Sequence, residues 1–423
     1  MTSTDSLAHA LERISGRVAE ARPRFDVEPV PLVAPGSVEQ VSELLRFASR
    51  DRLRVIPFGL GSKLGWCGIP GHVDFMLSTR NLSRVVSHVP DDGTISVEAG
   101  MTMAELRRRC REGGHFLTPD APRPECCTIG GVVAAGESGF DRLRFGPVRH
   151  HVLGTKVVLG SGTVAKSGGQ LVKNVTGYDL HRLYCGSHGS LCVIVEVSLR
   201  LFPEPEHELV ITTSAERDGD ALERARQALA LPGRTVSLTL RRDRSVGRAI
   251  AWSLHARLFG KRAPVEEERR ELLRVWPSAN VIEGAPARRA ADEMRDRHDG
   301  GDLRGPSFHL TCSPSKAAAV LREALDALDS AGCDGETLVQ PGVVEIDHFP
   351  RDAHDGRAEL VAPLRRIAGA HGGSLEYRNA PRSALVGLDP SGEPAAGLDL
   401  MRAIQKKLDP DGVFATGRFH GGL

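Results

Sequence analysis

Apolar residues recur at helical spacing near the start of the chain, and this pattern predicts a short amphipathic helix. Leu7, Leu11, Ile14 and Val18 carry the apolar stripe. A second stripe over residues 38–50 follows Ser37, a residue type that caps helix N-termini. Short runs rich in β-branched residues predict strands at residues 53–57, 73–77, 94–99, 152–159 and 191–202. The first half of the chain is therefore predicted to alternate helices with short strands.

The clearest break in the chain is the run Pro203-Glu204-Pro205-Glu206, because proline stiffens the backbone and removes hydrogen-bond donors. Beyond it, the pattern predicts strands at residues 208–213, 235–240, 306–312 and 342–346. Helices rich in Ala, Leu and Arg are predicted between them, at residues 220–229, 264–275, 315–329 and 357–370. This order indicates an α+β domain, followed by a last helix at residues 396–408 and an extended tail.

Composition narrows the class of protein. The 423 residues correspond to two or three domains of about 100–200 residues each. Lys and Arg number 55 against 54 Asp and Glu, so the chain has no large basic field for nucleic acid or anionic membrane. No apolar run approaches about 18 residues, which excludes a membrane-spanning helix. The N-terminus lacks the apolar core of a signal peptide, so we expect a cytoplasmic protein.

The eight cysteines argue against a metal centre. None forms a CxxC pair, and no four-cysteine run of the kind that holds an iron–sulfur cluster is present. We therefore predict no metal site and expect most of the thiols to be small buried apolar groups.

A glycine-rich loop directly after a predicted strand is the sharpest local feature. Glycines at this spacing let several backbone N–H groups converge on phosphate oxygens. The loop is not a Walker motif and not a dinucleotide fingerprint, because its last glycine comes one place late and Pro70 prevents a following helix. A purely structural turn is the alternative. The loop residues are Pro57, Phe58, Gly59, Leu60, Gly61, Ser62 and Lys63.

Three further motifs follow along the chain. Pro119-Asp120 precedes a tract of small residues from 128 to 139, against which a large planar ligand could lie; a buried small-residue helix is the alternative. The third motif is KNVTGYDL at residues 173–180, and the fourth is GSHGSLCVIVEV at residues 186–197.

These four motifs, in this order and spacing, resemble the FAD domain of the PCMH-type or vanillyl-alcohol-oxidase family of FAD-linked oxidases, over residues 26–205. KNVTGYDL with GSHGSL is similar to the glycolate and D-lactate branch, and so is the C-terminal LDPDGVF followed by GRF. Within that branch the chain most resembles the FAD-binding E subunits of bacterial glycolate oxidases. It departs from the family pattern at Cys192, which replaces a glycine, and at Thr416, which replaces a proline.

The resemblance implies an α+β fold and a division of the chain. It implies an N-terminal helix in residues 1–25 and a PCMH-type FAD-binding domain of two α/β subdomains in residues 26–205. An α+β cap with an antiparallel sheet is expected in residues 206–395. Residues 396–423 are expected to return to the FAD domain.

The resemblance also implies the residues that bind FAD. They are Pro57, Phe58, Gly59, Leu60, Gly61, Ser62, Lys63, Pro119, Asp120, Thr128, Ile129, Gly131, Ala135, Gly136, Ser138, Gly139, Lys173, Val193 and Ile194. The loop would hold the pyrophosphate, and Lys173 would place a cation near the flavin, with a salt-bridged surface lysine as the alternative. Relatives that tether FAD covalently use a histidine in this loop, where this chain has Ser62 or Lys63. We therefore expect non-covalent FAD, although Cys126 lies near the position of a second tether in some relatives.

The resemblance implies oxidation of a small 2-hydroxy acid, with hydride passing from the substrate Cα to flavin N5. Such chemistry needs a base for the hydroxyl proton, yet the chain lacks the Glu-His-Gly motif of relatives. His371 is interpreted as a loop residue, and residues 345–348 as a solvated strand end. The catalytic residue therefore stays unknown.

The expected function is that of the FAD-binding subunit of a glycolate or D-lactate dehydrogenase or oxidase complex. A related flavoprotein subunit and an iron–sulfur subunit would be its partners, and through them the chain would reach the periphery of the inner membrane. Two alternatives stay open. One is a self-sufficient FAD oxidase of another alcohol or sugar acid, and the other is a catalytically silent flavin-binding scaffold.

Overall fold

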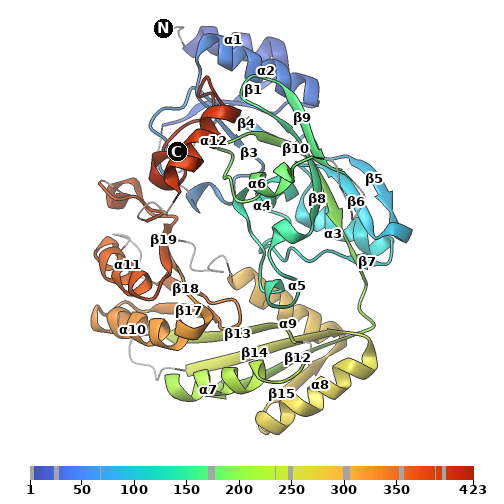
Figure 1. The fold of residues 1–423 in the computed structure, drawn as a ribbon, viewed down its shortest axis with the longest axis vertical. Helices are drawn as coiled ribbons and strands as arrows, with labels where there is room; N and C mark the ends of the chain where they lie inside the picture. Colours follow the sequence, from blue (N-terminus) through green and yellow to red (C-terminus); the bar gives the residue numbers. More distant parts are fainter. Residues whose placement is uncertain are drawn as a thin grey trace. The chain divides into compact units, whose positions relative to one another are not determined.

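The computed structural model divides the chain into two compact units (Figure 1). Unit 1 comprises residues 1–137, 147–203 and 393–423, and unit 2 comprises residues 138–146 and 204–392. The short segment 138–146 therefore leaves unit 1 and is packed within unit 2. The structure describes residues 4–22, 28–66, 68–169, 177–233, 235–245, 251–298, 305–351, 357–385, 387–392 and 397–423.

The first sheet of unit 1 has four strands and is accompanied by two helices. The strands are β1 (Val18–Ala21), β2 (Val30–Val33), β3 (Val55–Phe58) and β4 (Phe75–Ser78), and the helices are α1 (Thr4–Ser15) and α2 (Val38–Asp51). The strand order is β1-β2-β4-β3, with β2 and β3 parallel to β4 and β1 antiparallel to β2. Helix α2 begins where predicted, because the Ser37 side chain accepts a hydrogen bond from the N–H of Gln40 at 3.3 Å. Its apolar stripe is buried in the core of this sheet.

A segment from the end of the chain completes the edge of this sheet. After α12 (Leu398–Leu408), the backbone runs beside β3. The N–H of Val55 donates to the carbonyl of Val413 at 2.8 Å, and the N–H of Ala415 donates to the carbonyl of Val55 at 3.0 Å. Asp409 fixes the approach, since its carboxylate accepts the N–H groups of Val413 and Phe414. Residues more than 350 positions apart in the sequence thus share one sheet edge.

The second sheet of unit 1 has five antiparallel strands in the order β5-β6-β10-β8-β9. The central strand β10 is buried along nearly its whole length, as its run of β-branched residues predicts. Two further short strands, β7 and β11, pair with each other in an antiparallel ribbon. The elements are β5 (Val85–Val89), β6 (Thr94–Glu98), α3 (Met103–Glu112), β7 (His115–Phe116), α4 (Ile129–Ala135), β8 (Val152–Val158), β9 (Val164–Gly168), α6 (Leu180–Tyr184), β10 (Val193–Arg200) and β11 (Phe202–Pro203).

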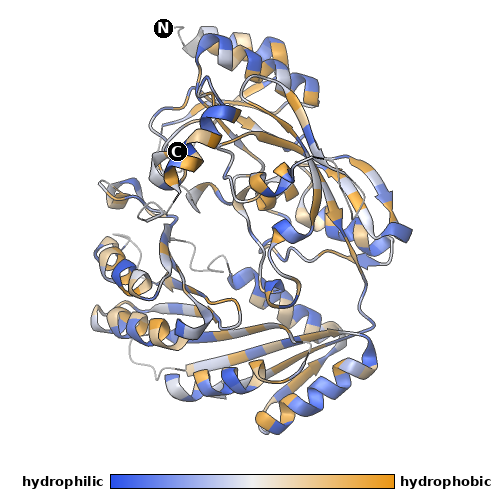
Figure 2. Cartoon of the chain, viewed as in Figure 1, coloured by the Kyte–Doolittle hydropathy of each residue, from blue (hydrophilic) through white to orange (hydrophobic). Residues whose placement is uncertain are grey.

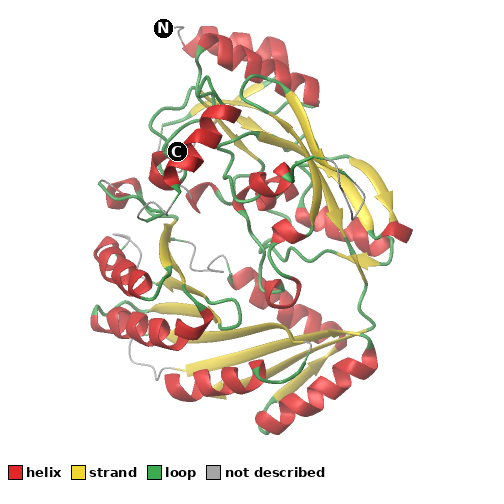
Figure 3. Cartoon of the chain, viewed as in Figure 1, coloured by secondary structure: helices red, strands yellow, loops and turns green. Residues whose placement is uncertain are grey.

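Unit 2 is an eight-stranded antiparallel sheet in the order β15-β12-β14-β13-β17-β18-β16-β19, with helices on both faces (Figures 1 and 3). Helices α7, α8, α10 and α11 lie on one face, and α5 and α9 lie on the other. The elements are α5 (Arg142–Phe145), β12 (His207–Ala215), α7 (Asp218–Leu229), β13 (Thr235–Arg244), β14 (Ala251–Gly260), α8 (Arg262–Val275), β15 (Asn280–Glu283), α9 (Gly284–Arg297), β16 (Ser307–Thr311), α10 (Ala317–Ser330), β17 (Gly335–Gln340), β18 (Glu345–Pro350), α11 (Val361–Ala370) and β19 (Ser374–Arg378).

The two faces of the unit 2 sheet differ in chemistry. Along β14, Leu254 and Leu258 face α7 and α8, whereas His255 and Arg257 point to the opposite face. Arg257 there pairs with Asp141 of segment 138–146 at 2.9 Å. Along each helix of unit 2, hydrophobic and hydrophilic residues alternate, as the colours of Figure 2 show. The face that carries Arg257 therefore combines charged pairs with a small buried apolar cluster of Phe140, Met294, Leu338 and Phe349.

Two expectations about unit 2 are wrong. The predicted strand at 342–346 is mostly the turn of the β17–β18 hairpin, where the N–H of Val344 donates to the carbonyl of Gln340 at 2.7 Å. Residues 345–348 are not a solvated strand end, because they lie inside β18, and Asp347 and His348 are only 3% and 2% exposed. The strand was misplaced because the β-branched pair Val343-Val344 in the turn has the composition of a strand. The burial of residues 345–348 was missed because β16 and β17 lie on either side of β18.

The predicted α+β architecture is confirmed, with two sheets in unit 1 and an antiparallel sheet that carries helices in unit 2. In the part of the chain that the structure describes, no helix is both long and apolar enough to cross a membrane.

Candidate functional site

The glycine-rich loop after β3 is held in a fixed shape by main-chain contacts. The hydroxyl of Ser78 donates to the carbonyl of Gly59 at 2.7 Å, and the N–H of Thr79 donates to the carbonyl of Phe58 at 2.9 Å. Gly61 has a φ of +88°, a conformation that L side chains rarely adopt. The loop therefore follows β3 as a rigid turn and leads into a short 3₁₀ turn at Leu64–Trp66.

Helix α4 packs directly on this loop. Thr128 caps the helix by accepting the N–H of Gly131 at 3.2 Å, and a side chain at Gly59 would come within 2.0 Å of the Thr128 hydroxyl oxygen. Gly136 ends the helix with a φ of +72°. Part of the small-residue tract at 128–139 is therefore the helix α4, which has a threonine cap at its start and a glycine at its end.

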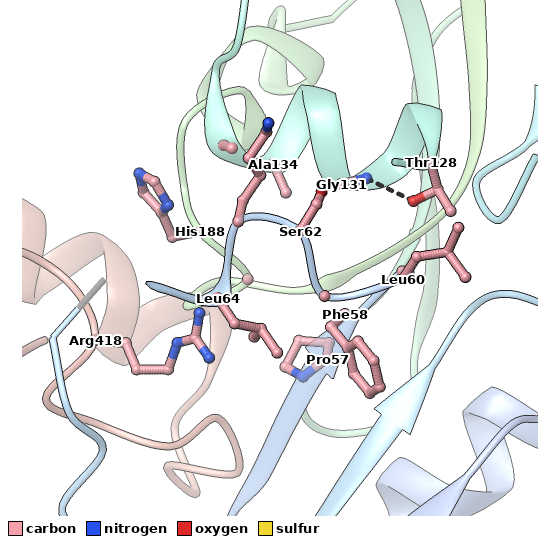
Figure 4. Close-up of a pocket in the computed structure, with 15 residues that line it drawn as sticks. Pro57, Phe58, Leu60, Ser62, Leu64, Thr128, Gly131, Ala134, His188 and Arg418 are labelled. Carbon is pink, nitrogen blue, oxygen red and sulfur yellow. Dashed lines mark hydrogen bonds between the residues drawn. The ribbon is translucent and has the colours of Figure 1, made fainter. Parts of the chain in front are cut away.

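The motif at residues 186–190 closes the third side of the pocket. The N–H of His188 donates to the carbonyl of Ala134 at 2.8 Å, which ties this loop to the end of α4. A Cβ at Gly189 would approach the Pro57 ring to 2.9 Å, so glycine permits the two loops to touch. Figure 4 shows these segments and Arg418 around one pocket, all within unit 1.

Lys63 forms a buried ion pair beside this pocket. Its Nζ lies 2.9 Å from Oε2 of Glu137, and the two side chains are 8% and 1% exposed. The same Nζ lies 4.7 Å from the centre of the Trp66 ring, a cation–π distance. Burial raises the pKa of the nearby Cys127 thiol to about 11; the charge of Lys63 lowers it by a smaller amount, and that of Glu137 adds to the rise. Cys127 is therefore a protonated, unreactive thiol at neutral pH.

The structure brings together ten of the residues predicted to bind FAD. They line the pocket and are Pro57, Phe58, Gly59, Leu60, Gly61, Ser62, Lys63, Thr128, Gly131 and Ala135. Leu64, Ala134, His188, Gly189 and Arg418 line it too, although the sequence reasoning did not select them. His188 and Gly189 stood in a recognised motif and Arg418 in the recognised C-terminal ending, but nothing in the sequence showed that these segments meet.

The other predicted residues that the structure describes do not line this pocket. Asp120 is buried and pairs with Arg107 at 2.7 Å, and the same guanidinium donates to the carbonyl of Pro119. Ile129 is part of the core, Gly136 caps α4, and Val193 and Ile194 begin the buried strand β10. Ser138 and Gly139 belong to the segment packed in unit 2. Lys173 lies outside the described residues.

A second polar cluster lies within unit 2. His309 of β16 and Asp347 of β18 face each other, with Nδ1 and Oδ1 2.6 Å apart. His298 Nε2 lies 3.7 Å from the other carboxylate oxygen, and Arg378 lies 3.9 Å from Oδ1. Burial alone would raise the pKa of Asp347, but His309, His298 and Arg378 together lower it below its usual value. Asp347 is therefore a carboxylate at neutral pH.

Among the described residues, no group of three or more His, Cys, Asp or Glu side chains is arranged to hold a metal ion. The contacts found in the polar cluster of unit 2 are hydrogen bonds and ion pairs.

Comparison with known proteins identifies the family. A family model described as an FAD binding domain matches residues 29–168. The D-lactate dehydrogenase of Archaeoglobus fulgidus is 30% identical over 439 aligned positions, which cover 93% of this chain and 94% of that protein. The chain belongs to the PCMH-type family of FAD-linked oxidases. The predicted family and the predicted FAD cofactor are thereby confirmed.

Other members of the FAD-linked oxidase family match over a shorter stretch. The glycolate oxidase subunit GlcD of Bacillus subtilis is 30% identical over 187 residues, 44% of this chain and 40% of that protein. A D-2-hydroxyglutarate dehydrogenase of Xanthomonas citri is 34% identical over 182 residues, 43% of this chain and 39% of that protein. The chain thus spans about two fifths of the length of these relatives.

The fold of the family also appears among solved structures. An alkyldihydroxyacetonephosphate synthase superposes with a TM-score of 0.69 over 92% of this chain and 76% of that protein, at 15% identity. At this identity the likeness shows the shared fold alone.

Proposed function

We propose that this protein is the FAD-binding subunit of a 2-hydroxy-acid dehydrogenase that acts on glycolate or D-lactate. The observation that carries the proposal is the similarity to a D-lactate dehydrogenase along nearly the whole chain. The names of the shorter matches, a glycolate oxidase subunit and a D-2-hydroxyglutarate dehydrogenase, belong to the same substrate class. We further propose a cytoplasmic location.

The residues of the unit 1 pocket fit FAD. A side chain at Gly59 would meet Thr128, and one at Gly61 would meet Leu64, so glycine at both positions permits the observed shape of the loop. In this shape the N–H groups of the loop can bind phosphate oxygens at the pocket. When bound, the flavin supplies an acceptor for the hydride of the substrate. We propose that the loop binds the pyrophosphate and that the flavin is held without a covalent bond.

The substrate is tested by anaerobic mixing of the purified chain with glycolate, D-lactate or D-2-hydroxyglutarate while the flavin absorption band is followed. Bleaching with glycolate, or with D-lactate or D-2-hydroxyglutarate but not with the corresponding L-enantiomer, supports the proposal if a simple alcohol leaves the band unchanged. If all three acids leave the band unchanged even with the partners present, the scaffold alternative is favoured.

The subunit assignment is tested by reconstitution. We expect the isolated chain to turn over slowly with an artificial electron acceptor, and activity to rise when a related flavoprotein and an iron–sulfur protein encoded nearby are co-expressed. Steady turnover by the isolated chain at the rates of ordinary enzymes, about 1–10³ s⁻¹, would instead favour a self-sufficient FAD oxidase.

A further inference from the structure

Arg418 is a buried cation at the unit 1 pocket without a carboxylate partner. Its residue exposure is 7%, and its side chain extends from the C-terminal segment toward the loop (Figure 4). Among the described residues, no acidic side chain forms an ion pair with it, and its buried Nε has no hydrogen-bond partner. The two other arginines that are as deeply buried are each paired: Arg242 with Asp329 at 2.7 Å, and Arg295 with Asp296 at 2.9 Å. Burial of a guanidinium without an anion is costly, so an anion is expected to reach it.

The main chain around Arg418 is fixed in place. Its carbonyl accepts the N–H of Gly68 at 3.2 Å, and its N–H donates to the carbonyl of Leu423 at 3.1 Å. The preceding Gly417 has a φ of +93°, and the following Phe419 ring lies 5.9 Å from the His188 ring. The side chain is therefore presented to the pocket by a tail that is anchored on both sides.

The charge balance of the pocket identifies the kind of ligand. Lys63 also lines the pocket, but Glu137 already neutralises its charge. Arg418 thus contributes the formal positive charge that the described lining residues leave uncompensated. A diphosphate matches this requirement, because its oxygens can accept both the loop N–H groups and a guanidinium.

We propose that Arg418 binds the pyrophosphate of FAD. Its guanidinium would provide the positive charge of the site, and the loop would provide neutral N–H donors. The proposal rests on the assignment of the pocket to FAD. It adds a residue from the C-terminal segment to a site otherwise built from residues 57–64, 128–135 and 188–189.

The test compares the affinity of the FAD-free full chain for FAD and for riboflavin, which lacks phosphate, by quenching of flavin fluorescence. We expect Arg418→Met to weaken FAD binding by roughly 10–100-fold, the size of one hydrogen bond to a charged group. Arg418→Lys should recover part of the loss, and riboflavin binding should not change. The salt dependence of FAD binding should also be shallower in Arg418→Met than in the parent.

Arg54→Met is the matched control, because Arg54 donates to the carbonyl of Asp411 in the same C-terminal segment but does not line the pocket. It should bind FAD like the parent. Arg418→Met that binds FAD like the parent would overturn the proposal, and so would an equal loss of FAD and riboflavin affinity. Gly61→Val separates the two assignments: if it abolishes FAD binding while Arg418→Met does not, only the role of Arg418 fails, and if neither weakens FAD binding, the pocket is not the FAD site.

Discussion

The Lys63–Glu137 pair allows a quantitative test of the electrostatics beside the pocket. Glu137→Gln keeps the shape of the side chain and removes its charge, which leaves the Lys63 ammonium buried. The two side chains are 8% and 1% exposed, so little water can replace the carboxylate. Removal of one partner from a buried pair costs about 3–5 kcal/mol of stability. The Trp66 ring, 4.7 Å from Nζ, contacts the ammonium in the parent and in the variant alike, so this contact does not reduce the expected loss.

We therefore expect Glu137→Gln to lower the free energy of unfolding of the FAD-free protein by about 3 kcal/mol. In a urea titration this shifts the midpoint of unit 1 by about 1 M for a slope near 3 kcal/mol per M. Glu105→Gln is the matched control, since Glu105 pairs with Arg108 on the exposed face of α3 and should change stability by less than about 1 kcal/mol. The double variant Lys63→Met with Glu137→Gln should recover most of the loss, because it removes both charges.

A loss below about 1 kcal/mol for Glu137→Gln would refute this reasoning. It would mean that water reaches the pair or that another anion neutralises Lys63. A double variant as unstable as Glu137→Gln would show that packing, and not the unpaired charge, causes the loss.

Three further predictions concern the loop, pH and the flavin. Gly61→Val should abolish FAD binding with the secondary structure intact, because Gly61 has a φ of +88° and the new side chain would meet Leu64; FAD affinity and circular dichroism measure this. Burial lowers the pKa of His348 to about 3 and that of His255 to about 4, so stability is lost as pH falls below about 6.5, where the unfolded histidines bind protons and the folded ones do not. Between pH 7.5 and pH 5 the loss should be about 2 kcal/mol for each histidine, measured by urea titration, and His348→Gln should remove its share. Acid precipitation of the holoprotein should release the flavin into solution, and flavin that stays with the chain would show a covalent bond and direct attention to Cys126.

The sequence predicted most securely what depends on local pattern. Ser37 and the stripe behind it predicted α2, and the motif after β3 predicted the loop that lies in the pocket. Arg418 and His188 were missed as neighbours of that loop, because their proximity is a consequence of the sheet edge and of loop contacts between distant segments. The β17–β18 hairpin was misplaced, since the apolar pair in its turn has the composition of a strand.

The buried charges of unit 2 show a different limit of sequence reasoning. Glu345 and Asp347 are acidic residues in a polar run, and such runs usually face water. In the fold, strands β16 and β17 flank β18, and His309 and Arg378 lie beside Asp347 as the polar partners that make its burial tolerable. These partners are 38 and 31 residues away from Asp347 in the sequence, so no local sequence pattern predicts them.

The strand edge beside β3 also has a consequence for the order in which the chain folds during synthesis. Residues 393–423 complete unit 1, but the ribosome makes them only after all of unit 2. At about 5–20 residues per second, the 190 residues from 204 to 393 delay them by roughly 10–40 s. During this interval the backbone groups of Val55 that later bind Val413 and Ala415 are open to other strands. Newly made unit 1 is therefore expected to depend on chaperones until its C-terminal segment arrives, and a fragment that stops at residue 203 should aggregate.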